Sequence, residues 1–126
     1  MKKIRVNIHV LTLYELSQSA DIEKLSKIIR GYHTEKGSLT YLLSKEYEDV
    51  IVQFDYPLSK KFETIIPKAK RISDILIPLA IIYKKEIYGT KEKMNEYGVW
   101  GHELSDLYFE SIEEKENNTL YISMGS

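Results

Sequence analysis

The sequence predicts an α+β domain, with a mixed or antiparallel sheet of about five strands and helices on one face. Two observations carry this prediction. Apolar residues alternate with polar ones in several segments, and in the middle of the chain they recur at helical spacing. The elements run strand, helix, strand, strand, broken helix, strand, strand. This order is related to the ferredoxin-like split βαβ arrangement with an added edge strand. With no repeat or linker, residues 1–126 form one domain.

The first two elements are a strand and a helix. Residues 4–13 alternate, with Ile4, Val6, Ile8 and Val10 on one side, which is typical of a half-buried strand. Ser17 to Ser19 suit a helix start, and apolar residues at helical spacing follow over 22–32. We expect this helix to end between Gly31 and Gly37.

Two further strands follow. Residues 39–43 predict a second strand, residues 45–48 a polar turn, and residues 50–56 a third strand with strict alternation. Pro57 ends the third strand, because proline cannot continue a ladder of hydrogen bonds.

A broken helical region is predicted over residues 59–98, with Ser59 as its cap. Its apolar stripe consists of Ile65, Ala69, Ile72, Leu76, Leu79, Tyr83 and Ile87. Pro67 and Pro78 interrupt the stripe, since each lacks a backbone donor and clashes with the preceding turn. The region is therefore one kinked helix or two helices. We favour a break near Ser73–Asp74 or at Pro78, in a first-turn position, and an end at Gly89 or Gly98.

A hairpin closes the chain. Residues 106–110 alternate as a fourth strand and residues 120–124 as a fifth. Asn117 and Asn118 lie in the polar turn between them, which predicts a β-hairpin.

Composition restricts the class of protein. The chain has no cysteine, which excludes a disulfide scaffold, a thiol nucleophile and a thiolate metal site. Arg5 and Asn7 interrupt the first apolar segment, so we expect no secretory signal. The longest apolar run, residues 75–83, is too short to span a membrane. We therefore expect a cytoplasmic protein that does not associate with membranes.

Charge is distributed unevenly along the chain. Residues 59–71 hold five basic side chains and one acidic, a net +4, whereas residues 99–126 hold six acidic and one basic, a net −5. Two interpretations stay open: two solvated faces, or a basic patch for an acidic partner and an acidic surface for a basic one. The acidic C-terminal region argues against generic nucleic-acid binding.

The segment Tyr97 to Glu103 is the most unusual local sequence, with the only tryptophan and two glycines in a short loop. We take Tyr97, Trp100, His102 and Glu103 as candidate contacts for a ligand or partner. In the alternative interpretation, Trp100 closes the end of the core and His102 bonds a backbone carbonyl. We expect Trp100 to be buried on one face of its ring and open on the other.

A second candidate set lies on the polar side of the first strand. Arg5, Asn7 and His9 should face away from the helices. They should share that face with Gln53, Asp55, Tyr121 and Ser123. Such a face is either solvated or an interface with a partner or a second copy. The aromatic signature of RRM domains is absent from residues 50–56.

No cofactor or metal is expected. The chain has no glycine-rich phosphate loop, no GxGxxG and no GxSxG. The three histidines, at positions 9, 33 and 102, lack metal-ligand spacing.

These observations favour a non-catalytic binding or inhibitor protein that acts on a protein partner. In size, element order and acidic, tyrosine-rich character, the chain resembles small bacterial or phage immunity proteins and counter-defence inhibitors. The alternative is a small-ligand or nucleotide-binding protein. This hypothesis includes a homodimer whose subunits join across a face of the sheet. A third hypothesis is a hydrolase with His102 as acid/base, supported by Glu103 or His9.

Overall fold

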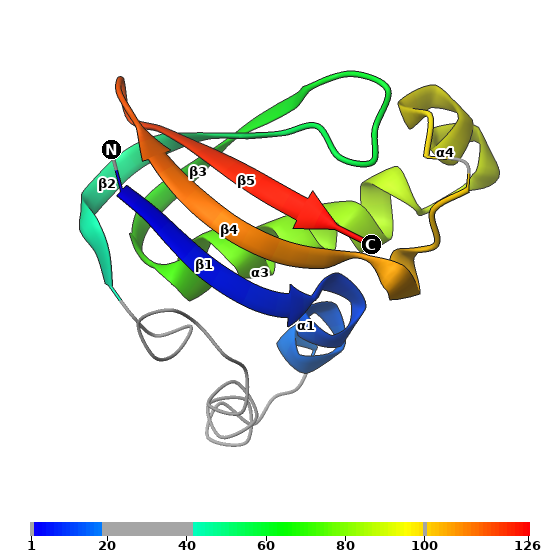
Figure 1. Ribbon diagram of the computed structural model, residues 1–126, viewed down its shortest axis with the longest axis horizontal. Coiled ribbons are helices and arrows are strands. Elements are labelled where there is room, and N and C mark those ends of the chain that lie inside the picture. The colour runs from blue at the N-terminus through cyan, green and yellow to red at the C-terminus, as the bar shows by residue number, and fades with distance from the viewer. Residues whose placement is uncertain (1, 19–41, 100) are drawn as a thin grey trace.

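The computed structural model describes residues 2–18, 42–99 and 101–126. Five strands form one mixed sheet in the order β1-β4-β5-β2-β3 (Figure 1). The strands are β1 (Lys2–His9), β2 (Leu42–Phe54), β3 (Phe62–Arg71), β4 (Tyr108–Lys115) and β5 (Thr119–Gly125). Neighbouring strands are antiparallel, except that β5 and β2 run parallel over three residue pairs. The predicted α+β class and its sheet are confirmed.

The helices of the described residues are short. They are α1 (Val10–Ser17), α3 (Ile72–Ile82) and α4 (Lys91–Tyr97), with a π-helical turn η1 (Tyr83–Ile87) and a 3-10 turn η2 (Leu104–Asp106). Helix α3 runs behind the sheet, and α1 continues directly from the end of β1 (Figure 1). Within the described ranges, no helix is long and apolar enough to cross a membrane.

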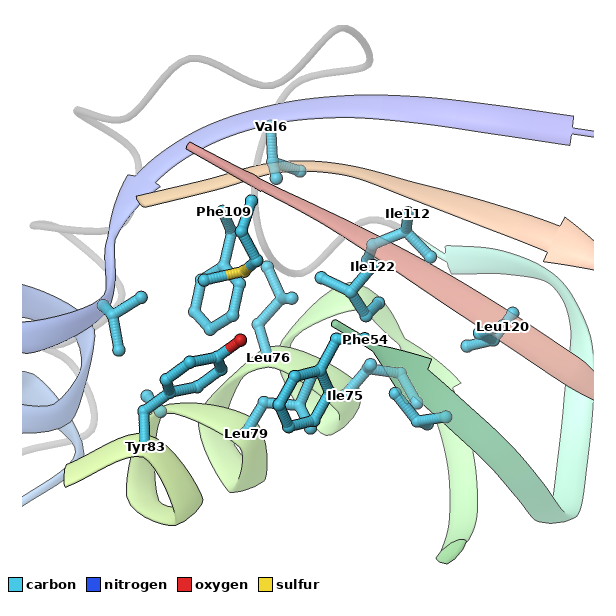
Figure 2. Packing of buried hydrophobic residues seen from close by; sticks show 14 of the residues in the cluster. Val6, Phe54, Ile75, Leu76, Leu79, Tyr83, Phe109, Ile112, Leu120 and Ile122 are labelled. Carbon is cyan, nitrogen blue, oxygen red and sulfur yellow. The ribbon is translucent and has the colours of Figure 1, made fainter. Parts of the chain in front are cut away.

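The core lies between α3 and the sheet. Ile75, Leu76 and Leu79 of α3 are fully buried, and they point toward the strands (Figure 2). The sheet contributes the inward-facing side chains Val6, Phe54, Phe109, Ile112, Leu120 and Ile122 (Figure 2). Tyr83 lies at the end of this layer, with its ring centroid 4.9 Å from that of Phe54. Burying this apolar surface on one side of the sheet is the main force that holds α3 in place.

The order of element types along the chain matches the prediction, although several elements are formed by other segments than predicted. The order of strands in the sheet differs from a ferredoxin-like sheet. There the first strand is an interior strand. Here β1 forms one edge and β3 the other, and the β4–β5 hairpin lies between β1 and β2.

The first strand is shorter than predicted. It ends at His9, and Val10 begins α1 instead of continuing the alternation. Val10 and Leu13 are both fully buried, three residues apart, as a helix requires. The Val10 amide donates to the carbonyl of Leu107 at 3.0 Å. The helix start predicted at Ser17 to Ser19 is wrong, because Ser17 is the last residue of α1 and Gln18 caps its end. The predicted helical segment 22–32 lies outside the described residues.

The turn predicted over residues 45–48 is wrong. These residues belong to β2, which is one strand of 13 residues joining the predicted second and third strands. Tyr47 is buried, while its neighbours on either side are exposed. A shift in register to β3 between Leu42 and Tyr47 disturbs the strict alternation that the sequence pattern requires.

The helix predicted from Ser59 is also wrong over its first half. Residues 62–71 form β3, an edge strand paired with β2. Ile65 and Ala69 matched the helical stripe, yet Ile65 is 63% exposed. Pro67 is tolerated because an edge strand has a side without ladder partners.

The chain does change structure close to the predicted break at Ser73–Asp74, but the boundary separates strand β3 from helix α3, which begins at Ile72, and not two helices. Asp74 Oδ2 accepts from the amide of Lys70 at 3.0 Å and from that of Arg71 at 2.9 Å. The carboxylate thus satisfies backbone donors where strand changes to helix. Pro78 lies inside α3, not in its first turn as predicted.

Two turn predictions are confirmed. Helix α4 ends at Gly98, whose φ of 70° is left-handed. Asn117 and Asn118 turn the β4–β5 hairpin with φ values of 60° and 51°, a conformation that asparagine tolerates better than most residues.

Candidate functional site

The face of the sheet opposite α3 presents polar side chains in rows. Residues directly opposite each other on paired strands point to the same face. The register therefore places one row across all five strands, consisting of Lys3, Glu113, Tyr121, Gln53 and Glu63. A second row consists of Lys115, Thr119, Ile51 and Ile65. We call this surface the exposed face.

Tyr121 lies at the middle of the exposed face. Its hydroxyl donates to Asp55 Oδ1 at 2.8 Å, and Lys115 Nζ lies 4.9 Å from its ring centroid. Burial, followed by the hydrogen bond to Asp55, raises the pKa of Tyr121 to about 12. The Tyr121 ring is thereby fixed as a rigid, partly apolar platform between charged side chains.

The residues predicted to share this face do so. Arg5 pairs with Ser111, which pairs with Ser123 on β5. Arg5, Asn7 and His9 are all exposed, and they alternate with buried Val6 and Ile8.

A pocket of about 320 Å³ opens at one end of the exposed face. It lies where β1 ends at His9 and β4 begins at Tyr108, two residues that are directly opposite in the sheet. Their rings meet edge to face with centroids 6.0 Å apart. The residues that line the pocket are Asn7, His9, Gly101, His102, Asp106, Tyr108 and Ser126. We call it the histidine pocket.

Tyrosines hold His102 in the histidine pocket. The Tyr56 hydroxyl lies 3.3 Å from His102 Nδ1, and the two rings pack edge to face at 5.3 Å. The same hydroxyl lies 2.6 Å from Ser126 Oγ. Tyr88 donates to the backbone carbonyl of His102 at 2.9 Å. Burial, with a smaller contribution from Tyr56, raises the pKa of Tyr88 to about 12.

The pocket offers hydrogen-bonding groups of several kinds: two imidazoles, an amide, a carboxylate and hydroxyls. Tyr108 donates to Glu110 Oε1 at 3.3 Å. The charge of Glu110 raises the pKa of the Tyr108 hydroxyl, so this phenol stays a neutral donor. Such a set can hold a polar small molecule or one protruding polar side chain of a partner.

The structure separates the candidates of the 97–103 segment. Tyr97 is buried and donates to Glu86 Oε1 at 3.2 Å, outside the histidine pocket. The side chain of Glu103 is exposed, and the described partner of the His102 ring is Tyr56. Trp100, with the expectation about its burial, lies outside the described residues.

The histidine pocket also contains residues that the sequence did not single out. Asp106 follows His102 by four positions and lies in η2. Tyr108 is found only once the register places it opposite His9. Tyr56 follows the end of β2 and contacts the His102 ring without lining the pocket itself, and no local pattern could have indicated that contact.

The described residues contain no group of three or more histidine, aspartate or glutamate side chains placed to hold a metal ion. Comparison of the chain with protein-family models, curated proteins and solved structures finds no match in any of the three.

Proposed function

We propose that the protein is a non-catalytic binding protein that acts by occupying a protein partner, as an immunity protein or counter-defence inhibitor does. The partner would lie against the exposed face and place one polar side chain in the histidine pocket. As the sequence predicts, we place this activity in the cytoplasm.

The supporting observation is that the histidine pocket is continuous with the exposed face. His9 and Tyr108 belong both to the pocket and to the sheet. Interfaces are commonly anchored by one side chain in a pocket, with a polar surround that selects the partner. Tyr121, fixed by Asp55, supplies a rigid aromatic contact of the kind enriched in interfaces.

The test is affinity capture from a lysate of the native host with three immobilised proteins. They are the wild type, a pocket variant with His9→Ala and His102→Ala, and a control variant with Lys93→Ala and Glu96→Ala. The control removes an exposed ion pair of 3.5 Å on α4, away from the pocket. A protein captured by the wild type and the control, and reduced at least about tenfold on the pocket variant, supports the proposal. Equal capture by all three, or none at low and moderate salt, contradicts it.

A second candidate function is small-ligand or nucleotide binding in the histidine pocket. Its volume of about 320 Å³ lies at the lower end of the range for ligand sites, roughly 300–1,000 Å³. Mass spectrometry of a denatured extract of the purified protein tests this candidate. A small molecule released from the wild type, and absent from the pocket variant, would favour ligand binding over partner binding.

A further inference from the structure

The outer edge of β3 has backbone groups directed away from the sheet. The Ile51 amide donates to the carbonyl of Asn118 at 2.9 Å, so the backbone of Ile51 faces β5. Ile65 is directly opposite Ile51 on β3. In an antiparallel pair, the backbone N–H and C=O groups of two opposed residues either point toward each other and form hydrogen bonds, or both point away from each other. The N–H and C=O of Ile65 therefore point outward, and those of Glu63, two residues earlier, do the same.

Pro67 supports this assignment. It is two residues after Ile65, so its nitrogen also faces outward, where a missing N–H costs no ladder bond. Pro67 and then Lys68, with a φ of 52°, end the regular edge. The stretch able to pair with another strand is therefore short and centred on Ile65.

The Ile65 side chain adds an apolar contact at the same place. It is 63% exposed, and it is one of two large apolar side chains that stand out as exposed among the described residues. Outward backbone groups beside an exposed apolar side chain are the features by which sheets accept an added strand.

Charge selects the occupant of this edge. Lys60 and Lys61 precede it, and Lys68 and Lys70 follow it. Glu63 is the one acidic side chain in residues 59–71, and it accepts from Gln53 Nε2 at 2.8 Å. A second copy of β3 would bring lysines against lysines, which repel. An acidic strand meets the opposite charge at both ends.

We propose that the outer edge of β3 binds a short, extended, acidic segment of a partner protein by strand addition. The segment forms main-chain hydrogen bonds with Glu63 and Ile65, and its carboxylates face the flanking lysines. This inference rests on the proposed partner-binding function but uses a different surface. Substitutions in the pocket and substitutions at the edge therefore test the two proposals independently.

The test uses two capped synthetic peptides, one alternating valine with glutamate and one alternating valine with lysine. Amide resonances are followed by NMR in the wild-type protein. With the glutamate peptide we expect shifts at Glu63 and Ile65 and amide exchange slowed at least about tenfold, and weaker binding at higher salt. The lysine peptide should produce neither effect.

Two variants separate pairing from simple charge attraction. Ile65→Pro removes an outward N–H without removing a bond to β2, and it should abolish binding, whereas Ile65→Val keeps it. Lys60→Glu with Lys61→Glu leaves the backbone intact and should weaken binding of the glutamate peptide at least about tenfold.

Three results would overturn the inference. The wild type could bind both peptides equally, or its amide exchange at Glu63 and Ile65 could stay unchanged with the glutamate peptide. The third is a pocket variant that loses binding of the glutamate peptide as fully as the edge variants do. Peptide binding that survives in the pocket variant supports it. If lysate capture fails while the peptide still binds, the proposed use of the histidine pocket fails and the edge site stands.

Discussion

Tyr47 of β2 donates a hydrogen bond to Glu114 Oε1 of β4 at 3.1 Å, and both side chains are buried. The same oxygen accepts from the amide and the hydroxyl of Ser44, at 3.1 and 2.9 Å. Glu114 Oε2 is buried without a hydrogen-bond partner among the described residues. One carboxylate oxygen of β4 thus holds the first half of β2 in place through three hydrogen bonds. This half of β2 precedes the residues that pair with β5.

Replacing Tyr47 with phenylalanine should destabilise the fold by about 1–3 kcal/mol, because a buried acceptor loses one of its donors. Urea denaturation measures the change in the free energy of unfolding. Tyr14→Phe is the control, because it removes the hydroxyl of another partly buried tyrosine that packs against the core. A loss for Tyr47→Phe no larger than for the control would show that the bond contributes little.

Stability should fall at alkaline pH. The pKa values of Tyr47, Tyr88 and Tyr121 are each raised to about 12, with burial as the largest cause. The unfolded chain releases these protons near pH 10, about two units earlier, so between these values it binds fewer protons than the folded chain. The free energy of unfolding then decreases by roughly 1 kcal/mol or less per pH unit for each tyrosine. Below the unfolded pKa, these groups add no pH dependence.

Urea denaturation between about pH 9 and 11.5 tests the alkaline effect. The variant Tyr88→Phe should show a shallower decline than the wild type, because one raised pKa is removed. A flat profile over this range would contradict the assignment.

Gly98→Ala should be more harmful than Gly101→Ala. Both glycines have positive φ, 70° and 86°, so both substitutions strain the backbone by about 1 kcal/mol or more. A Cβ at Gly98 would lie 2.6 Å from Ser59 Oγ, whereas nothing lies within 4 Å of one at Gly101. We expect an additional loss of about 1–2 kcal/mol at Gly98, measured by thermal or urea unfolding. Adding Ser59→Gly should recover most of that difference.

Asp74→Ala should cost about 1–2 kcal/mol, because the amides of Lys70 and Arg71 lose their acceptor. Asp49→Ala is the control, an exposed aspartate on β2. Hydrogen exchange gives a second readout, since the Lys70 and Arg71 amides should exchange faster in the Asp74 variant alone. Unchanged exchange at these amides would contradict a capping role.

The sequence predicts the type of an element correctly where only one periodicity, that of a strand or that of a helix, fits the segment. The β4–β5 hairpin has clear alternation on both sides of two asparagines, and it was predicted correctly. The error at β3 arose because Ile65, Ala69 and Ile72 satisfy helical spacing across a strand–helix boundary. The hydrogen-bond ladder with β2 makes this segment a strand and not a helix. That ladder is a contact between distant parts of the sequence, so the local spacing of apolar residues does not reveal it.

The candidate site was predicted as two separate sets. The alternation in the first strand predicts that Asn7 and His9 face away from the helices, and His102 belongs to an unusual loop. Their meeting in one pocket depends on the pairing of β1 with β4.

The short parallel contact between β2 and β5 has a consequence for how the chain is synthesised. The β2–β3 and β4–β5 hairpins close locally, but Ile51 reaches Thr119 only after the whole segment between these two residues has been made. Until β5 emerges from the ribosome, the inner edge of β2, with its apolar side chains Val50, Val52 and Phe54, has no neighbouring strand. An unpaired apolar edge on a nascent chain is prone to aggregate, so cells under heat stress should lose newly made molecules before they lose finished ones.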